Sequence, residues 1–454
     1  MNNTDWNQKT VQELEDFLKN KIVLQGSEEY AALKIGWAVT NNKPAIICFC
    51  STTEDVQAAV TLAGKKKLPL SVRGGGHDWQ GRSVAHQGFV IDLEHLNTIV
   101  IDPDAKVATI GGGVTALKLI NAADPYGLIA TVGNCGEIGM TGYSLVGGYG
   151  LTSPSTGLAA DSIIGAEVVL ANGQIVTASE AENPDLLWGL RGGGGSFGVV
   201  TSLRLSLYPA KPLLAGFIMF PLSETETILH GYNKLMKSAP DELSAIVAFK
   251  PAPDGTKVIM IAPTWYGDVE EGQRVIDSIR KLGNPVMEQV TETTIKDLLE
   301  SLSNFIENGH FHYCTTRWMS DVAPEVMTAI ADAASQPTSA LSGIGLMHLH
   351  GAPARVPLSE TAFGLREAHF AVSALAEWTT EDTANADIHK KWVDDLFEKI
   401  DSYALPGGYL AFMGNDDKEQ LANAHGSNLP RLQSVRKKFD PNGVFSREQV
   451  PLAR

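Results

Sequence analysis

Cysteine is scarce in this sequence, with four residues in 454: Cys48, Cys50, Cys135 and Cys314. Four scattered cysteines are too few for the disulfide framework of a small secreted domain. Cys48 and Cys50 lie in an apolar run, two positions apart, so we expect both on the buried face of a strand. A zinc site needs further ligands close by, and the sequence shows none, so we predict no metal.

Positive charge and long apolar runs are also lacking. Lys and Arg number 36 against 52 Asp and Glu, which gives a net charge of −16. That balance argues against nucleic acid or an anionic membrane as the main partner. No apolar run is long enough to span a bilayer. The first six residues have neither the basic nor the apolar region of a secretory signal, so we expect a cytoplasmic protein.

Glycine, by contrast, is abundant, and two Gly-rich segments each carry one nucleophile. Residues 71–78 read Ser-Val-Arg-Gly-Gly-Gly-His-Asp and contain His77. Residues 132–139 read Val-Gly-Asn-Cys-Gly-Glu-Ile-Gly and contain Cys135. Glycine lets successive N–H groups point at an anion. The pair therefore predicts a large phosphate-bearing cofactor that is cradled by the backbone and also covalently tethered.

The spacing of apolar residues divides the chain into two kinds of region. Up to about residue 205, short strands alternate with Gly-rich turns, and residues 164–177 predict a hairpin whose Asn172-Gly173 suits a type I′ turn. Glycine becomes rarer after residues 208–212, where we place a domain boundary. Beyond it we expect strands at residues 214–220, 245–250, 257–265, 344–350 and 370–376.

Several segments, in order, resemble the FAD-linked oxidases with the vanillyl-alcohol-oxidase type of flavin fold. These segments are residues 73–77, 133–150 and 195–201. Residues 157–161, 184–188, 214–218 and 439–445 are similar to the berberine-bridge-enzyme-like group, close to its 6-hydroxynicotine oxidase branch. An ordered set of this kind is far more specific than one Gly-rich loop.

The resemblance covers nearly the whole chain and implies an α+β fold. A two-part PCMH-type FAD-binding domain would comprise residues 1–210 and a C-terminal return, residues 406–454. Between them, residues 211–405 would form a substrate domain with an antiparallel sheet covered by helices.

The same resemblance implies how FAD is held. His77 corresponds to the residue bonded to the flavin 8α-methyl group, and Cys135 to the residue bonded to C6. The residues alone also allow a phosphate-binding histidine and a buried structural thiol, and the nicotine-oxidase branch lacks this cysteine. Two bonds would fix the flavin's orientation and raise its reduction potential. Other expected FAD contacts are Arg73, Gly74, Gly75, Gly76, Asp78, Gly139, Thr141, Gly142, Tyr143, Gly147, Gly148, Tyr149, Gly150, Gly198, Val200 and Asn442.

Three residues are candidates for the catalytic base. Tyr409 matches the tyrosine of the family's Tyr-x-Asn motif, although Ala411 replaces the asparagine. A phenol with a pKa of about 10 needs a tuned environment to act as a base. His348 and His350 share one face of a predicted strand, and histidine titrates near neutrality. For each of the three, plain packing is the alternative.

The electron acceptor depends on Ile138, which follows Cys135 by three residues. The family places there a residue that controls oxygen access, with valine in oxidases and bulkier residues in dehydrogenases. We therefore expect an FAD-dependent oxidoreductase that takes hydride from a C–H next to O or N of a small molecule and passes electrons to O2 or another acceptor. An amine, an alcohol and a sugar remain open as substrates. A non-catalytic flavin-binding module is the alternative. An NAD-dependent dehydrogenase fits the sequence poorly, because no Gly-x-Gly-x-x-Gly follows a first strand with an acidic residue about 20 positions later.

Overall fold

A small mixed sheet begins the fold in the computed structural model, which describes residues 6–33, 36–251, 255–303, 307–414 and 417–445. Its strand order is β1-β2-β4-β3, with β1 antiparallel to β2 and the other neighbours parallel. Helix α3 (Thr53–Lys66) links two parallel strands, and the Thr52 hydroxyl caps it by accepting the N–H of Asp55. The strands are β1 (Ile22–Leu24), β2 (Ile46–Phe49), β3 (Leu70–Arg73) and β4 (Phe89–Asp92).

An antiparallel sheet of order β5-β6-β10-β8-β9 follows. The predicted hairpin is present as β8 and β9, but its turn differs from the expected type I′. Leu170 bonds to Gln174 across a three-residue loop, and only Gly173 takes a positive φ, of 77°. This is the longer hairpin loop that ends in a left-handed glycine. The strands are β5 (Ile99–Asp102), β6 (Val107–Gly111), β8 (Ile163–Val169), β9 (Ile175–Ala178) and β10 (Val199–Ser206).

The middle of the chain forms a larger antiparallel sheet of order β15-β12-β14-β13-β17-β18-β16. The predicted strands in this region are confirmed, whereas β15 and β16 escaped prediction because their sequences are rich in polar residues. The strands are β12 (Leu213–Pro221), β13 (Leu243–Pro251), β14 (Lys257–Tyr266), β15 (Met287–Thr293), β16 (Phe311–Met319), β17 (Gly343–Leu349) and β18 (His369–Trp378).

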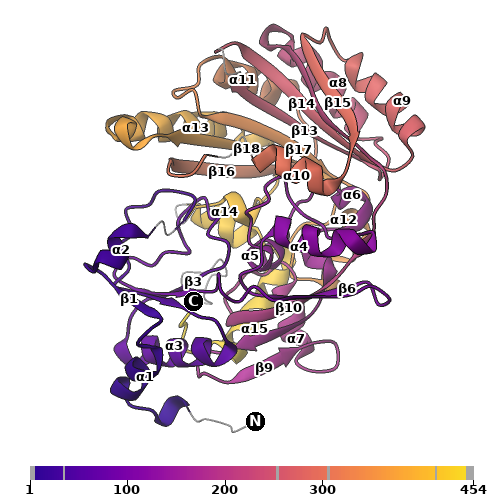
Figure 1. The fold of residues 1–454 in the computed structure, drawn as a ribbon. Helices are drawn as coiled ribbons and strands as arrows, with labels where there is room; N and C mark the ends of the chain where they lie inside the picture. The colour runs from indigo at the N-terminus through magenta and orange to yellow at the C-terminus, as the bar shows by residue number, and fades with distance from the viewer. Residues whose placement is uncertain (1–5, 34–35, 252–254, 304–306, 415–416, 446–454) are drawn as a thin grey trace.

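Helices cover one face of this sheet and leave the other face toward the N-terminal part of the chain (Figure 1). Their apolar side chains form one core with alternate residues of the strands, such as Ile344, Leu346 and Phe370. The opposite face is therefore available to form a site. The covering helices are α8 (Thr225–Met236), α9 (Val269–Arg280), α11 (Pro324–Ser335) and α13 (Ala386–Ile400).

The C-terminal helices return to the N-terminal part, as their yellow ribbons in Figure 1 show. Leu432, Val435 and Phe439 of α15 share a core with α7, β8 and β10. We propose on this basis the three-part division at residues 210 and 405, whose extreme ends, residues 1–5 and 446–454, lie outside the described residues. The remaining helices include α1 (Val11–Leu18), α2 (Glu28–Ala32), α4 (Ala116–Ala123), α5 (Met140–Leu145), α6 (Ser153–Thr156), α7 (Pro184–Leu190), α10 (Ile295–Ser303), α12 (Ala352–Arg355), α14 (Lys418–Asn423) and α15 (Leu429–Phe439).

A buried ion pair joins the two parts of the chain. Arg366 is 5% exposed and donates to both carboxylate oxygens of Asp161, at 2.6 and 3.0 Å. We expect Arg366→Met to lower the free energy of unfolding by about 3–5 kcal/mol, because it leaves a buried carboxylate without its counter-charge.

Urea unfolding measures this loss, and Arg355→Met provides the control. Arg355 pairs with Asp241 on the surface, where solvent screens the interaction. Equal losses in the two variants would show that the Asp161–Arg366 pair has no special role.

Candidate active site

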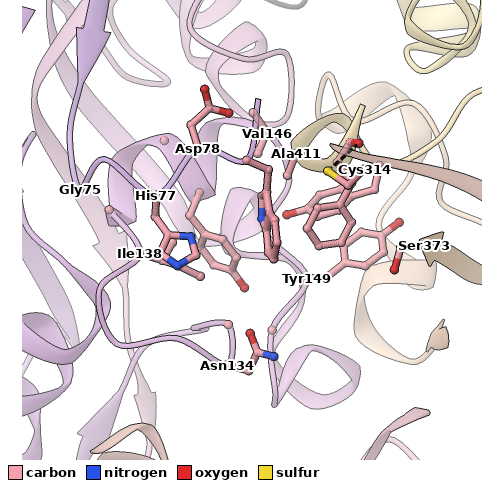
Figure 2. Close-up of a pocket in the computed structure, with 18 of the residues that line it drawn as sticks. Gly75, His77, Asp78, Asn134, Ile138, Val146, Tyr149, Cys314, Ser373 and Ala411 are labelled. Carbon is pink, nitrogen blue, oxygen red and sulfur yellow. Dashed lines mark hydrogen bonds between the residues drawn. The ribbon is translucent and has the colours of Figure 1, made fainter. Parts of the chain in front are cut away.

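A cavity of about 510 Å³ lies between the two Gly-rich loops and the face of the large sheet opposite its helices. Figure 2 shows His77 and Ile138 on one side of it and Tyr149, Cys314 and Ser373 on the other. This volume is within the range of about 300–1,000 Å³ that ligand pockets occupy. Most of the expected FAD contacts line it, namely Gly74, Gly75, Gly76, His77, Asp78, Gly139, Thr141, Gly142, Tyr143, Tyr149, Gly150, Gly198 and Val200.

Ion pairs of Arg73 stabilise the start of the first Gly-rich loop. Arg73, at the end of β3, donates to Asp92 at 2.5 Å and to Glu94 at 3.0 Å. Its guanidinium is thus occupied behind the loop, and Arg73 is not among the residues that line the cavity. The loop also touches its partner closely, since a Cβ on Gly75 would lie 2.4 Å from the backbone nitrogen of Gly139. Any larger residue at position 75 would push the two loops apart.

The two predicted nucleophiles lie in contact; His77 lines the cavity, and Cys135 lies behind it, outside the residues that line the cavity. Cys135 Sγ lies 3.3 Å from His77 Nε2, although the residues are 58 positions apart. Desolvation lowers the pKa of His77 to about 4, so its imidazole is neutral and keeps a lone pair near neutral pH. Burial raises the pKa of Cys135. The side chains that would form covalent bonds are therefore adjacent and uncharged.

An aromatic stack fixes the plane of the His77 ring. Trp37 lies parallel to it, with ring centres 4.3 Å apart and an angle of 8° between the planes. The other face of Trp37 stacks on His312 at 4.1 Å. The backbone N–H of Trp37 donates to Gly76 O at 3.0 Å. Nothing in the sequence pattern indicated this contact.

Two buried polar groups of the cavity have no hydrogen-bond partner in the described part of the chain, and they indicate the kind of ligand that the cavity fits. Thr141 Oγ1 and Tyr143 OH are buried, line the cavity and lack a hydrogen bond to any described residue. Buried polar atoms are normally hydrogen-bonded. Two such groups beside a Gly-rich loop fit a cofactor that brings its own polar atoms, as FAD does.

Tyr409 lies on the cavity wall, 4% exposed, and stacks on Tyr149 with ring centres 4.4 Å apart. Burial raises the pKa of Tyr409 to about 12, while hydrogen bonds from the backbone N–H groups of Gly148 and Tyr149 oppose that rise. Gly147 and Gly148 have positive φ values of 112° and 76°, and neither lines the cavity. The turn that contains them, after α5, packs against Tyr409, and their contact with FAD stays a prediction.

The Tyr149 hydroxyl belongs to a buried network. His369 Nδ1 donates to Glu367 O at 2.7 Å, which leaves Nε2 to accept from the Tyr149 hydroxyl, also at 2.7 Å. Trp318 Nε1 donates to the same hydroxyl at 3.0 Å. Both hydrogen-bonding roles of this hydroxyl are thereby filled, so Tyr149 is held in place and Tyr409 stacks on a fixed surface.

The two strand histidines lie on the other face of the sheet. His348 is paired in register with Phe370, and its ring packs on Phe370 at 4.3 Å between centres. Phe370 belongs to the helix-covered core, whereas the neighbouring Met347 faces the cavity. His350 donates to Pro240 O and does not line the cavity. His348 nevertheless borders the cavity, although its ring packs on Phe370, while Tyr409 faces the cavity with its ring stacked on Tyr149. The role of catalytic base stays a prediction.

Several other residues of the site were not expected, and Asn442 joins the expected residues that do not line the cavity. Asn442 is exposed in a turn after α15. Alternation along β16 was the signal that could have placed Cys314 on the cavity side. Additional residues that line the cavity include Trp79, Arg82, Lys250, Cys314 and Ser373.

Comparison with known proteins agrees with this geometry. Residues 44–179 match the FAD binding domain, and residues 408–450 match the berberine and berberine-like domain. The FAD-linked oxidoreductase aurO of Gibberella zeae is 31% identical over 435 residues, covering 94% of this chain and 84% of that relative. The chain belongs to the FAD-linked oxidoreductases.

This oxidoreductase is also similar to enzymes of named activity. The (R)-6-hydroxynicotine oxidase of Paenarthrobacter nicotinovorans is 28% identical, with 89% of this chain and 90% of that enzyme covered. A crystal structure of 6-hydroxy-D-nicotine oxidase from Arthrobacter nicotinovorans has a TM-score of 0.85 at 26% identity and covers 95% and 97% of the two chains. The predicted family, fold class, enzyme class and FAD cofactor are confirmed.

The described residues of the oxidoreductase include neither a membrane-spanning helix nor a metal cluster. None of its described helices combines the length and apolar character needed to cross a bilayer. Within the same residues, no cluster of three or more His, Cys, Asp or Glu side chains has the arrangement of a metal site.

Proposed function

We propose that this oxidoreductase binds FAD covalently through His77 and Cys135 and oxidises a small molecule at a C–H bond next to O or N. The 3.3 Å distance between Cys135 Sγ and His77 Nε2 supports covalent attachment through both residues. Each attachment replaces an N–H or S–H and a flavin C–H by one N–C or S–C bond, a two-electron oxidation for which O2 serves as acceptor. Bound FAD supplies the hydride acceptor for the substrate.

The chain's own contribution to catalysis centres on Tyr409. The backbone N–H groups of Gly148 and Tyr149 favour its phenolate form, although burial raises the pKa of Tyr409 to about 12. A phenolate at the cavity wall takes the proton from the substrate's hydroxyl or amine while the hydride leaves carbon. Stacking on the fixed Tyr149 ring keeps the oxygen aimed at those donors.

Anaerobic mixing with panels of alcohols, sugars and amines tests the oxidoreductase directly. We expect at least one class to bleach the flavin absorbance. If no member of any panel did so, catalysis by this site would be refuted and the non-catalytic flavin module would stand.

Ile138 lines the cavity next to His77, where its bulk restricts access to the bound flavin (Figure 2). We expect Ile138→Val to speed reoxidation of the reduced enzyme in air-saturated buffer by about tenfold, a barrier decrease of roughly 1.4 kcal/mol. Stopped-flow absorbance measures this rate.

Ile246→Val is the matched control for this prediction, because it removes the same methylene from the sheet side of the cavity. An equal acceleration in both variants, or fast reoxidation of the unaltered enzyme, would remove Ile138 from the control of oxygen access.

A further inference from the structure

The sheet face of the cavity is a flat and mainly apolar surface. Strands β13, β17 and β18 present alternate side chains to it, while the intervening side chains enter the helix-covered core. Few hydroxyls are available there, and Ser373 directs its own toward Gly345 O at 3.4 Å. The residues on this face are Ser244, Ile246, Ala248, Gly343, Gly345, Met347, Ser373 and Leu375.

Two glycines leave this surface without protruding side chains. A Cβ on Gly345 would lie 2.9 Å from Ser373 Oγ, and one on Gly343 would lie 2.9 Å from Phe249 O. The absence of side chains at both positions leaves a strip on which a planar ring can lie against the backbone. An oligosaccharide, by contrast, needs many directed hydrogen bonds that this face does not offer.

Negative charge within the cavity is already neutralised. Of the described residues that line it, only Asp78 carries a carboxylate. That carboxylate accepts from Arg82 at 3.0 Å and from the Ser83 N–H at 3.1 Å, and these contacts hold its pKa below the usual value. A cationic substrate would therefore enter without a counter-charge.

Positive charge is available at the end of the flat strip. Lys250 lines the cavity near the end of β13, beside Gly343, whose added Cβ would lie 3.8 Å from Lys250 Cβ. No described residue forms an ion pair or hydrogen bond with its ammonium group. The side chain of Lys250 is exposed, and Glu377 of β18 is hydrogen-bonded to His310 at 2.7 Å. The ammonium of Lys250 is thus available to a ligand that lies on the strip.

We infer that the substrate is a planar, largely apolar molecule that bears an acidic group, and that Lys250 binds this group while the ring lies over Gly343 and Gly345. The inference rests on the proposed function, since it names the substrate class of the same cavity. It favours an acidic aromatic alcohol or heterocycle over a cationic amine and over a sugar.

Unreactive probes of equal shape test the charge preference. Naphthalene-2-carboxylate, its carboxamide and its amidinium differ in charge, and calorimetry on the flavin-containing enzyme gives the dissociation constant of each. We expect the carboxylate to bind about fivefold or more tighter than the carboxamide, as for a partly solvated ion pair. The amidinium should bind most weakly.

Variants of Lys250 locate the preference. Lys250→Met should abolish the difference between carboxylate and carboxamide, and Lys250→Glu should invert the order in favour of the amidinium. Lys257→Met, which removes the same charge from the neighbouring strand where Lys257 donates to Ser335 O, should leave the order intact. A carboxylate preference that survives Lys250→Met, or the absence of any preference, would overturn the inference.

The two proposals fail in different ways. Flavin released by acid from the unaltered enzyme would refute the covalent attachment and leave the charge preference standing. Covalent flavin without a charge preference would refute the substrate class alone.

Discussion

Replacing both His77 and Cys135 by alanine is expected to release all of the flavin into the supernatant when the protein is precipitated with acid. Each single variant should keep its flavin in the pellet, because the remaining nucleophile still reaches the cofactor. The 3.3 Å distance between the two atoms fits attachment to the same ring of the flavin, at its 8α-methyl carbon and at C6. Absorbance of pellet and supernatant measures the partition.

Cys314→Ala is the matched control for this experiment. Cys314 is buried like Cys135 and lines the cavity, but it lies on β16 and its sulfur contacts Phe412 O and the Gln80 side chain. We expect this variant to behave as the unaltered enzyme. If His77→Ala alone released all of the flavin, Cys135 would be a structural thiol, and the attachment would be single.

Replacing Tyr409 by phenylalanine is expected to slow anaerobic flavin reduction by about 10²–10⁴-fold, the usual contribution of a positioned general base. The ring and its stack on Tyr149 are preserved, so flavin content should not change. Stopped-flow absorbance, with whichever substrate bleaches the unaltered enzyme, measures the rate. The surface variant Tyr403→Phe should reduce at the unaltered rate.

The raised pKa of Tyr409 also predicts how the rate of flavin reduction changes with pH. The pKa of Tyr409 is raised to about 12, so the basic phenolate form is a small fraction at neutral pH and grows as pH rises. The reduction rate of the unaltered enzyme should therefore increase with pH, approaching tenfold per unit below that pKa. The phenylalanine variant should show no such increase. A rising profile that persists in the variant would place the base elsewhere.

The sequence alone could predict features that depend on residues close together in the chain. Glycine runs marked both loops, and the alternation in residues 344–350 correctly put His348 and His350 on one face. The burial of Cys48 and Cys50, with their sulfur atoms 3.8 Å apart, also follows from an apolar run and strand geometry.

Contacts made between distant segments could not be predicted. Both faces of the large sheet are covered, one by helices and one by the loops around the cavity, so alternation could not say which face His348 occupies. The Arg73 guanidinium was free to face either the cofactor or the carboxylates of Asp92 and Glu94 until β4 was placed beside β3. The Trp37 stack depends on a segment that precedes His77 by 40 positions and has no motif of its own.

Mass spectrometry of the denatured, proteolysed enzyme tests the covalent proposal most directly. We expect one FAD to link the peptide that contains His77 to the peptide that contains Cys135, with no bond to any other peptide. Recovery of both peptides at their unmodified masses, with FAD free in solution, would contradict it.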